Sequence, residues 1–434
     1  MMTENLFDLL SPTQQRVFEQ VRAASTHTAT PAYLVGGAVR DWLLGASRIG
    51  DLDFVIEGDA INFAYALQQT HGGAVQAHEK FRTATWLVRE GEVAHAFDFA
   101  TARAEVYPRP AMLPQISPTN IETDLQRRDF AINAIALRLS DGALLDPLDG
   151  RGDLKRGLIR ILHPQSFVDD PTRLFRAARY AARFNFVLDA DTQQATATGL
   201  PHLRSLSGER VKYDLELIFE EAEPERALLL LQRWQVFRAM GIPVPDEDRV
   251  CARFARLRKC LGEGDWPLET LEQTPQEIVR AVSWGAITYN TGQLSVSRWI
   301  ELIPFVVEVR DALVSLGALS TLSSQMFRSD KLSASSALLK DFSGLALLIG
   351  HLFDPDALKR RAMLCEWKDW RWVRPVTNGD DLRKLGVPPG PIYAKVLQQL
   401  RAAWLNGEVK SLAEEQALLK TVLQANSPLG LRLL

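Results

Sequence analysis

The sequence predicts an α/β domain followed by a longer all-α region, because strand-like and helical patterns alternate only in the first third of its 434 residues. Short runs of β-branched and aromatic residues are separated there by helical stretches. Beyond Asp170, helical periodicity continues to the end of the chain. This length allows two to four domains, since single hydrophobic cores stop growing near roughly 250–300 residues.

Four strands and two helices are expected in the α/β part. The strands are expected at residues 32–35, 51–56, 83–88 and 93–99, and the helices at residues 38–44 and 61–69. Glu90-Gly91 is expected to join the last two strands. Four prolines predict an irregular loop over residues 107–118. The serine-rich segment 320–343 is the best candidate for a mobile linker within the helical part.

Composition excludes several classes of protein. Hydrophobic residues make up 46% and charged residues 24% of the chain, which is ordinary for a soluble globular protein. No run approaches the ~18 apolar residues of a membrane span, and the acidic N-terminus does not resemble a signal peptide. Cys251, Cys260 and Cys365 are odd in number and lack metal-ligand spacing, which favours a reducing cytosol. We therefore expect a cytoplasmic protein without membrane contacts.

The charge is unevenly distributed. A net charge of −3 argues against a protein that coats nucleic acid nonspecifically. Residues 151–183, however, contain eight basic residues against three acids. Such a segment can hold a polyphosphate or an RNA backbone, although charge alone fits a solvated helical face equally well.

Asp51 and Asp53 are candidate metal ligands. On a strand, residues i and i+2 point to the same face, so both carboxylates are expected to project together. Adjacent carboxylates repel unless a cation lies between them. Mg²⁺ prefers oxygen ligands, and two ions about 3.5–4 Å apart can hold the oxygens of an in-line phosphoryl displacement. Taken alone, this pattern is more often a solvated strand edge.

Gly36 and Gly37 lie where the first expected strand gives way to a helix. Free backbone N–H groups and the helix dipole at such a point can receive a triphosphate. Arg40, one turn later, can reach the same phosphates. The commoner explanation of a glycine pair alone is a tight turn that needs glycine for its backbone angles.

Taken together, these motifs resemble the class II tRNA nucleotidyltransferase and bacterial poly(A) polymerase family. Residues 34–41 (LVGGAVRD) with Asp51-Leu52-Asp53 resemble its first motif, and residues 126–134 (QRRDFAINA) its second, with Ala131 in place of the usual Thr. Residues 146–150 (DPLDG) are similar to the link into its neck helices. Residues 169–173 (DDPTR) resemble its nucleotide-selecting motif, with Asp169 in place of Glu. Residues 207–210 (SGER) resemble the start of its last common motif, where Asp214 replaces Glu.

The match is specific in the first half of the chain, where four ordered motifs fall within roughly 180 residues. Beyond residue 221 only residues 378–382 (NGDDL) and 385–391 (LGVPPGP) are similar to many members. The resemblance implies a nucleotidyltransferase head with a mixed, polymerase-β-like sheet at residues 20–147. It also implies an all-α neck at 148–220 and an all-α body and tail at 221–434 that hold RNA.

The resemblance also implies roles for individual residues. Asp51 and Asp53 are expected to be catalytic through two Mg²⁺ ions. The expected nucleotide-binding residues are Gly36, Gly37, Arg40, Arg128, Asp170, Arg173, Arg176 and Arg179. Asp129 and Asn133 are expected to order that site.

Asp170 and Arg173 form the expected base-selecting pair, one helical turn apart. A carboxylate accepts from an exocyclic amino group, while a guanidinium donates to the adjacent ring acceptor. Cytosine and adenine present that edge, whereas uracil and guanine present a carbonyl, so the pair favours C and A by about 1–3 kcal/mol per pairing. Without the family, Asp170 and Pro171 are more simply explained as a helix N-cap and first turn.

The expected activity is template-independent addition of C, A or both from CTP and ATP to the 3′ end of tRNA, with release of pyrophosphate. Three alternatives stay open: a specialised A-adding or CC-adding enzyme with a partner nucleotidyltransferase, a poly(A) polymerase, and a catalytically dead RNA-binding module. In the family, a loop between the first two motifs lets the pocket change from C to A, and CC-adding members have it shortened. Residues 100–122 supply such a loop. We therefore expect addition of A, with a slight preference for complete CCA synthesis, although Pro108, Pro110 and Pro114 stiffen the loop.

Two further patterns have structural and functional explanations. Asp98 ends an expected strand, and a structural salt bridge is favoured there over a place near the metals. Trp367, Trp370 and Trp372 alternate with basic residues, and helix packing is favoured over stacking on RNA.

Overall fold

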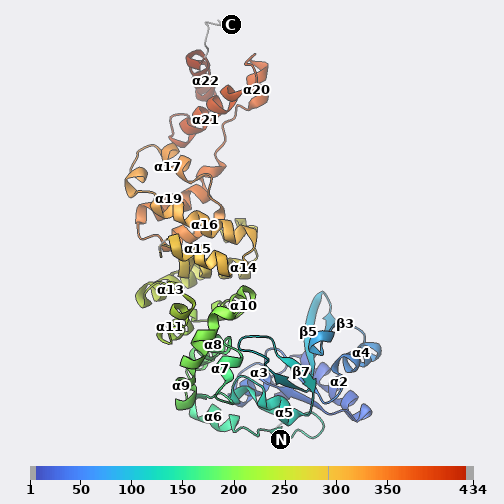
Figure 1. The fold of residues 1–434 in the computed structure, drawn as a ribbon. Coiled ribbons are helices and arrows are strands. Elements are labelled where there is room, and N and C mark those ends of the chain that lie inside the picture. The colour runs from blue at the N-terminus through green and yellow to red at the C-terminus, as the bar shows by residue number, and fades with distance from the viewer. Residues whose placement is uncertain (1–5, 292, 427–434) are drawn as a thin grey trace. The chain divides into compact units, whose positions relative to one another are not determined.

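The computed structural model describes residues 6–291 and 293–426. The chain divides into two compact units, Met1–Gly241 and Ile242–Leu434 (Figure 1).

A seven-stranded mixed sheet forms the centre of the first unit, with the strand order β3-β4-β5-β2-β1-β8-β9. Its strands are β1 (Ala32–Val35), β2 (Asp53–Ile56), β3 (Ala74–His78), β4 (Thr83–Glu90), β5 (Val93–Thr101), β8 (Ala136–Arg138) and β9 (Leu144–Leu145). Within this sheet β2 and β5 pair in parallel, and the other neighbours are antiparallel. The predicted mixed-sheet α/β fold is confirmed.

Three helices pack on this sheet, namely α2 (Pro12–Thr28), α3 (Gly37–Leu43) and α4 (Ala60–His71). A capping box between Ser11 and Gln14 fixes the start of α2, with Pro12 at the first helical position. All four residues of β1 are buried, because the strand lies between β2 and β8 and beneath helices. The strand therefore holds the turn at its end, Gly36-Gly37, in a fixed place.

A second, two-stranded sheet pairs β6 (Arg103–Val106) with β7 (Gln115–Pro118). The antiparallel register joins Val106 to Gln115, so residues 107–114 form the connection. The prediction of an irregular loop over residues 107–118 is therefore wrong at its C-terminal end, where β7 pairs. The hairpin leads into α5 (Ile121–Gln126), which is capped by Asn120.

The rest of the first unit is helical apart from a short parallel pair, β10 (Leu158–Ile159) with β11 (Val187–Leu188). Its helices are α6 (Gly150–Arg156), α7 (Ser166–Asp169), α8 (Arg173–Phe184), α9 (Ala190–Gly199), α10 (Gly208–Phe219), α11 (Pro224–Arg233) and α12 (Val236–Met240). Three 3₁₀ turns complete it, η1 (Glu79–Phe81), η2 (Ala131–Asn133) and η3 (Leu200–Ser205). Helix α8 packs against α10 and α11, which fixes the side chains that it presents.

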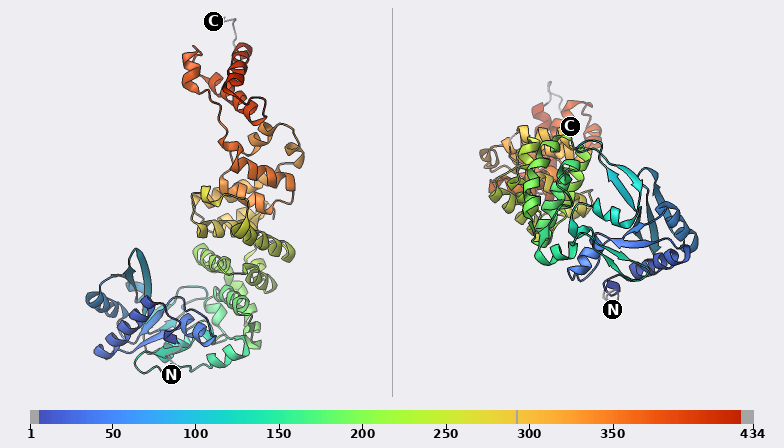
Figure 2. Two further views of the ribbon diagram at one scale, coloured as in Figure 1. Left: turned by 180° about the vertical axis from the view of Figure 1, so that it is seen from behind. Right: turned by 60° about the horizontal axis from the view of Figure 1, so that its bottom comes forward.

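The second unit is all-helical in the residues that the structure describes. Its helices are α13 (Glu247–Glu263), α14 (Pro275–Thr288), α15 (Gln293–Leu302), α16 (Val307–Thr321), α17 (Leu332–Leu339), α18 (Gly344–Phe353), α19 (Ala357–Lys368), α20 (Gly379–Lys384), α21 (Pro391–Leu405) and α22 (Leu412–Asn426). Short 3₁₀ turns are η4 (Leu268–Thr270), η5 (Ser324–Phe327) and η6 (Trp370–Trp372). The buried α18 packs against α13, α14, α16 and α19, whereas α20, α21 and α22 share a separate hydrophobic cluster in the red C-terminal part of the ribbon (Figure 2).

Two predictions about this helical region can be compared with the structure. The mobile linker expected at residues 320–343 is wrong, because the segment forms η5 and α17 and buries Ser335 and Ser336. Trp367 stacks on Trp266 with ring centroids 6.2 Å apart and donates to Thr270, as helix packing predicts. Trp372, by contrast, is largely exposed.

None of the described helices is by itself long and apolar enough to cross a bilayer, and only the bent pair α17 and α18 passes that test when the two are joined.

Candidate active site

The turn between β1 and α3 is built on Gly36. This residue has φ +68, a conformation that L side chains rarely adopt. A Cβ atom added there would lie 3.2 Å from Nη1 of Arg128, so the turn and this arginine are closely packed. Gly37 follows as the first residue of α3. The sequence prediction of a strand, a glycine turn and a helix is met at this point.

Asp53 opens β2 and lies directly opposite Asp98 in the parallel pairing with β5. Asp98 accepts a hydrogen bond of 2.5 Å from the hydroxyl of Thr85 on β4. Crowding by protein atoms, followed by the charges of Asp98 and Asp51, raises the pKa of Asp53 to about 6, although Arg128 opposes the shift. The Asp53 side chain still reaches solvent. We attribute the shift to poor hydration in a concave site next to two like charges.

Asp51 differs from its expected position. β2 begins at Asp53, so Asp51 precedes the strand on which it was expected. It lines a neighbouring hollow with Asp41, Glu90 and His95. Its charge nevertheless raises the pKa of Asp53, so the two carboxylates remain close enough to interact.

Asp98 also differs from its expected role. A structural salt bridge was favoured, but no cation of the described residues lies within ion-pair distance of this carboxylate. Asp98 is the register partner of Asp53, and its carboxylate accepts a hydrogen bond from the Thr85 hydroxyl. Asp98 is therefore an exposed carboxylate on the residue paired with Asp53, and its place near the metals stays a prediction.

These carboxylates suit a magnesium ion that the substrate helps to hold. No group of three or more His, Cys, Asp or Glu side chains is arranged as a metal cage in the part of the chain that the structure describes. Mg²⁺ is commonly bound by one or two carboxylates together with substrate phosphates and water, so a complete protein cage is not required. Burial is the main cause of the raised pKa of Asp53, and a cation would relieve the further contribution from the charges of Asp98 and Asp51.

A strongly basic cleft with a volume of about 480 Å³ adjoins Asp53. Its charged lining consists of nine arginines and four carboxylates, namely Arg40, Arg103, Arg127, Arg128, Arg173, Arg176, Arg179, Arg183, Arg210, Asp53, Glu105, Asp129 and Asp170. Gly36, Gly37 and Asn133 also line it. Such an excess of guanidinium groups fits a polyphosphate ligand, since arginine donates bidentate hydrogen bonds to phosphate oxygens.

Arg128 is held in the cleft by Asp124, which is fully buried on α5. Nη2 of Arg128 donates to this carboxylate at 3.0 Å, and Arg127 binds its other oxygen. Burial alone would raise the pKa of Asp124, but Arg128 and Arg127 hold it below its ordinary value. The buried Nε of Arg128 has no hydrogen-bond partner among the described residues. This nitrogen is covered by protein atoms, so Arg128 faces the cleft through other parts of its side chain.

Arg176 and Arg179 enter the cleft from consecutive turns of α8. Nε of Arg176 donates to Asp129 at 2.7 Å, and this buried carboxylate also accepts from Asn133. The charge of Asp129 raises the pKa of Arg176 further above its ordinary value. The guanidinium of Arg179 lies 5.1 Å from the ring centroid of Tyr180, and that of Arg40 lies 5.0 Å from the same centroid, so both make cation–π contacts. The expected ordering role of Asp129 and Asn133 agrees with these contacts.

Arg40 makes contacts that the sequence did not predict. Its guanidinium is buried, donates to Asp41 and to Asn133, and lies 4.7 Å from the ring centroid of Phe184. All three of its nitrogen atoms thus have protein partners. Arg40 lines the cleft but links α3 to α8 and η2, whereas a free phosphate-binding side chain was expected.

Asp170 and Arg173 both line the cleft but do not bond to each other through their side chains. Asp170 accepts from the backbone N–H and hydroxyl of Thr172 and from Arg210. Arg173 is buried, and it donates to Ser166 at 2.6 Å and to the carbonyl of Arg127 at 2.9 Å. Each member of the predicted pair is therefore positioned separately by its own partners. Asp170 also satisfies the N–H of Thr172, in partial agreement with the capping alternative.

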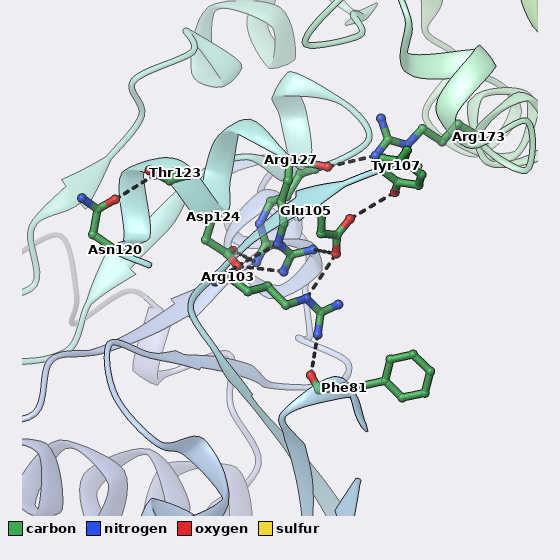
Figure 3. Close-up of polar contacts among 10 residues, drawn as sticks. Phe81, Arg103, Glu105, Tyr107, Asn120, Thr123, Asp124, Arg127 and Arg173 are labelled. Carbon is green, nitrogen blue, oxygen red and sulfur yellow. Dashed lines mark hydrogen bonds and ion pairs between the residues drawn. The ribbon is translucent and has the colours of Figure 1, made fainter. Parts of the chain in front are cut away.

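The hairpin β6–β7 supplies cleft residues that the sequence analysis missed. Glu105 on β6 accepts from Arg103, Arg127 and Tyr107, and Arg127 in turn offers its carbonyl to Arg173 (Figure 3). Burial is the main cause that raises the pKa of Tyr107, so its phenol stays protonated. No local sequence pattern marks these residues, since their contacts depend on tertiary structure. Arg210, by contrast, lay within a quoted motif and could have been singled out.

A mixed sheet with a carboxylate at the start of its inner strand β2, next to an arginine-lined cleft, defines a nucleotidyltransferase head. The model of the poly A polymerase head domain matches residues 32–160. An A-adding tRNA nucleotidyltransferase of Halalkalibacterium halodurans is 30% identical over 429 residues, covering 94% of this chain and 93% of the relative. One from Geobacter sulfurreducens is 33% identical over 404 residues, which are 89% of this chain but 44% of that relative. A CC-adding tRNA nucleotidyltransferase of Deinococcus radiodurans is 39% identical over 210 residues, 47% of this chain and 54% of the relative.

Solved structures agree along nearly the whole chain. A Thermotoga maritima CCA-adding enzyme complexed with tRNA has a TM-score of 0.73 and 26% identity. CCA-adding enzyme complexes with ATP and with CTP have TM-scores of 0.76 and 0.75, at 26% and 25% identity. Each of the three covers 98% of both chains. The chain belongs to the class II tRNA nucleotidyltransferase and poly(A) polymerase family, and it is an enzyme that adds nucleotides to tRNA 3′ ends.

Proposed function

We propose that this enzyme adds the terminal A to tRNA that ends in CC, with ATP as the donor and pyrophosphate as the product. The observation that carries the proposal is that Asp53 and the pair Asp170 and Arg173 line one basic cleft, so a base-selecting and a phosphate-transferring group can act on one nucleotide. Support for A comes from the two A-adding relatives that align with most of this chain.

In the proposed reaction the 3′ hydroxyl of the RNA attacks the α-phosphate of ATP. A new P–O bond forms to the RNA as the hydroxyl loses its proton to solvent, the bond between the α-phosphate and its bridging oxygen to the β-phosphate breaks, and pyrophosphate leaves with its charge. Mg²⁺ held by Asp53, Asp51 and the substrate would supply charge stabilisation at the reacting oxygens. Asp98 adds a third carboxylate beside Asp53.

The arginines of the cleft would bind and orient the triphosphate. Arg128 lines the cleft beside Gly36, and Arg176 and Arg179 line it from α8. Gly36 lets the guanidinium of Arg128 pack against the turn at the start of α3, which places this arginine beside the site proposed for the phosphates. Arg40 acts as a positioning residue, because it fixes Asn133 and the aromatic face of α8.

Base selection would use Asp170 and Arg173, each held in place by its own partners. Asp170 would accept from the amino group of adenine, while Arg173 would donate to the neighbouring ring nitrogen. Because Arg173 is buried and bonded to Ser166 and Arg127, its position is set before the base arrives. A carbonyl in place of the amino group would leave Asp170 facing another acceptor, which disfavours U and G.

Complete CCA synthesis is the second candidate, because the solved CCA-adding enzymes with ATP and CTP match this chain over 98% of its length. Under the first proposal, a partner nucleotidyltransferase must supply tRNA that ends in CC. The all-helical second unit would hold the body of the tRNA. We also propose a cytoplasmic location, since none of the three cysteines forms a disulfide.

Incubating the enzyme with tRNAs that end before CCA, after one C and after CC, each with ATP or CTP alone, tests the proposal. The proposed function requires one A on tRNA ending in CC and no C on either shorter tRNA. Addition of C to the shorter tRNAs as well would make the chain a CCA-adding enzyme. A long A tail on any RNA would make it a poly(A) polymerase.

A further inference from the structure

The connection between β6 and β7, residues 107–114, is attached to the protein at both its base and its middle. At its base, Glu105 binds Tyr107 and is itself held by Arg103 and Arg127 (Figure 3). Tyr107, Leu113 and Pro114 from this connection line the basic cleft. The segment is therefore a wall of the nucleotide site with a defined position.

Ala111 is the point at which the middle of the segment is attached. It is buried, with φ +62. Its backbone N–H donates to the carbonyls of Val168 at 3.3 Å and Asp169 at 3.2 Å, directly before Asp170. Its own carbonyl accepts from Nη1 of Arg210 at 2.8 Å. A turn that projects from the hairpin is thus bonded to the end of α7 and to α10.

The same guanidinium reaches the base-selecting carboxylate. Nη2 of Arg210 donates to Oδ1 of Asp170 at 2.5 Å. This oxygen also accepts from the N–H and hydroxyl of Thr172, at 3.0 Å and 2.6 Å. No donor of the described residues lies within hydrogen-bonding distance of Oδ2 of Asp170. Three donors on one oxygen fix the carboxylate and leave the other oxygen for a ligand.

We propose, resting on the role proposed above for Asp170, that Arg210 is a positioning residue that couples segment 107–114 to base selection. The guanidinium of Arg210 binds the Ala111 carbonyl through Nη1 and the Asp170 carboxylate through Nη2. The position of segment 107–114 relative to Oδ2 of Asp170 is thereby fixed. A displacement of the segment moves Arg210 and changes where Oδ2 points. Nη1 and Nη2 of Arg210 are bonded to Ala111 and Asp170, and in this proposal Arg210 acts on the base through these two groups.

The chemistry of the arginine fork is what makes this coupling specific. Two nitrogens of a planar guanidinium donate in fixed directions, whereas a lysine ammonium is a point charge on a flexible stem. Lysine at position 210 would retain attraction to Asp170 but would not hold both acceptors in one geometry. Glutamine would lose the charge and retain at most one amide donor group.

The test combines single-nucleotide incorporation on tRNA ending in CC with hydrogen exchange of the peptide that contains residues 107–114. Arg210→Gln should lower the ratio of kcat/KM for ATP over that for UTP or GTP at least about tenfold, as expected for loss of a charged hydrogen bond. Hydrogen exchange of the amides in segment 107–114 should become at least about tenfold faster, because the Ala111 carbonyl loses its hydrogen bond from Arg210. Arg210→Lys should lie between Arg210→Gln and the wild type in both measurements.

Arg204→Gln is the matched control, because Arg204 also donates to a backbone carbonyl, that of Ala239, but does not line the cleft. It should leave both measurements unchanged. If Arg210→Gln keeps the wild-type ratio, or leaves exchange of the segment unchanged, the coupling is wrong even if kcat falls. If Arg210→Gln does not fold, Arg210→Lys decides, and both quantities must again move together.

Failure of the proposed function would look different. Wild-type enzyme that adds C and not A to tRNA would overturn the assignment of A. In that case the ratio of kcat/KM for CTP to that for UTP or GTP would still test the role of Arg210. A wild-type enzyme that adds A, with an Arg210→Gln variant of unchanged selectivity, would overturn only the coupling.

Discussion

Asp53 and Asp98 are register partners at the start of the parallel pairing between β2 and β5, and the charge of Asp98 acts on Asp53 more strongly than that of Arg128. Their mutual repulsion contributes to the raised pKa of Asp53. Two carboxylates are held this close only where the fold imposes it, and the natural partner for them is a divalent cation carried in with phosphates. The metal-binding proposal begins from this relationship.

Removing either carboxylate should change the dependence on Mg²⁺. Asp53→Asn should reduce incorporation at least about a hundredfold, since metal stabilisation of the reacting oxygens is worth several kcal/mol. Asp98→Asn should retain activity but raise the Mg²⁺ concentration for half-maximal rate severalfold. Asp141→Asn, at an exposed turn paired with Arg138, is the control. An Mg²⁺ titration of the four proteins measures this, and an Asp53→Asn variant with near-normal turnover would refute the assigned centre.

Changing Asp170 to Asn should alter which bases are accepted. The amide can still accept from Thr172 but offers a donor to a carbonyl, so UTP or GTP should gain relative to ATP by about 1–3 kcal/mol, or roughly 5- to 150-fold. Competition between labelled nucleotides on tRNA ending in CC measures the ratio. Retained strict selectivity in both Asp170→Asn and Arg173→Ala would place base selection elsewhere.

Asp124 should be important for stability as well as for the site. It is fully buried and bound by Arg127, Arg128 and the backbone N–H of Arg103. Asp124→Ala should cost about 3–5 kcal/mol, because it leaves two arginines without their buried partner. Urea unfolding followed by circular dichroism provides the free energy of unfolding. A loss below about 1 kcal/mol, the range of surface ion pairs, would show that solvent replaces the carboxylate easily.

Asp214 should make stability fall as pH rises. Burial raises its pKa to about 7, although Arg176, Arg179 and Arg210 oppose the shift and Asp170 adds to it. The folded pKa lies above the unfolded value, so this group's contribution to stability is present below about pH 4 and is lost between about pH 4 and 7. Asp214→Asn should therefore gain stability over the wild type across that range, by at most about 4 kcal/mol, with little further change above it. Free energies of unfolding of the two proteins that differ by the same amount at all pH values would contradict the raised pKa of Asp214.

The sequence predicted those parts of the fold that rest on local patterns. β1, β4 and β5 were placed within one or two residues, because alternation and a glycine turn mark them. β3, the hairpin strands β6 and β7, and the short strands β8 to β11 were missed. β3 is mostly solvent-exposed, β6 and β7 pair through a proline-containing connection, and β8 to β11 have only two or three residues each. Pairing of this kind is decided by tertiary contacts.

The candidate site was predicted by residue type better than by contact. Every expected nucleotide-binding residue lines the cleft. Arg40 is nevertheless committed to Asp41 and Asn133, and Asp51 lies before the strand. The bond from Arg210 to Asp170 joins residues forty positions apart. No spacing rule along the chain anticipates a contact over that separation.

The most direct test of the central claim is the ratio of kcat/KM for ATP to that for CTP on tRNA ending in CC. The two bases share the amino-plus-acceptor edge, so this ratio isolates the shape of the pocket whose wall is fixed through Ala111 and Arg210. An enzyme that adds the terminal A should prefer ATP at least about a hundredfold on this tRNA and should fail to add C to tRNA ending before CCA. Efficient use of CTP on the shorter tRNA, or no preference for ATP on the CC end, would contradict it.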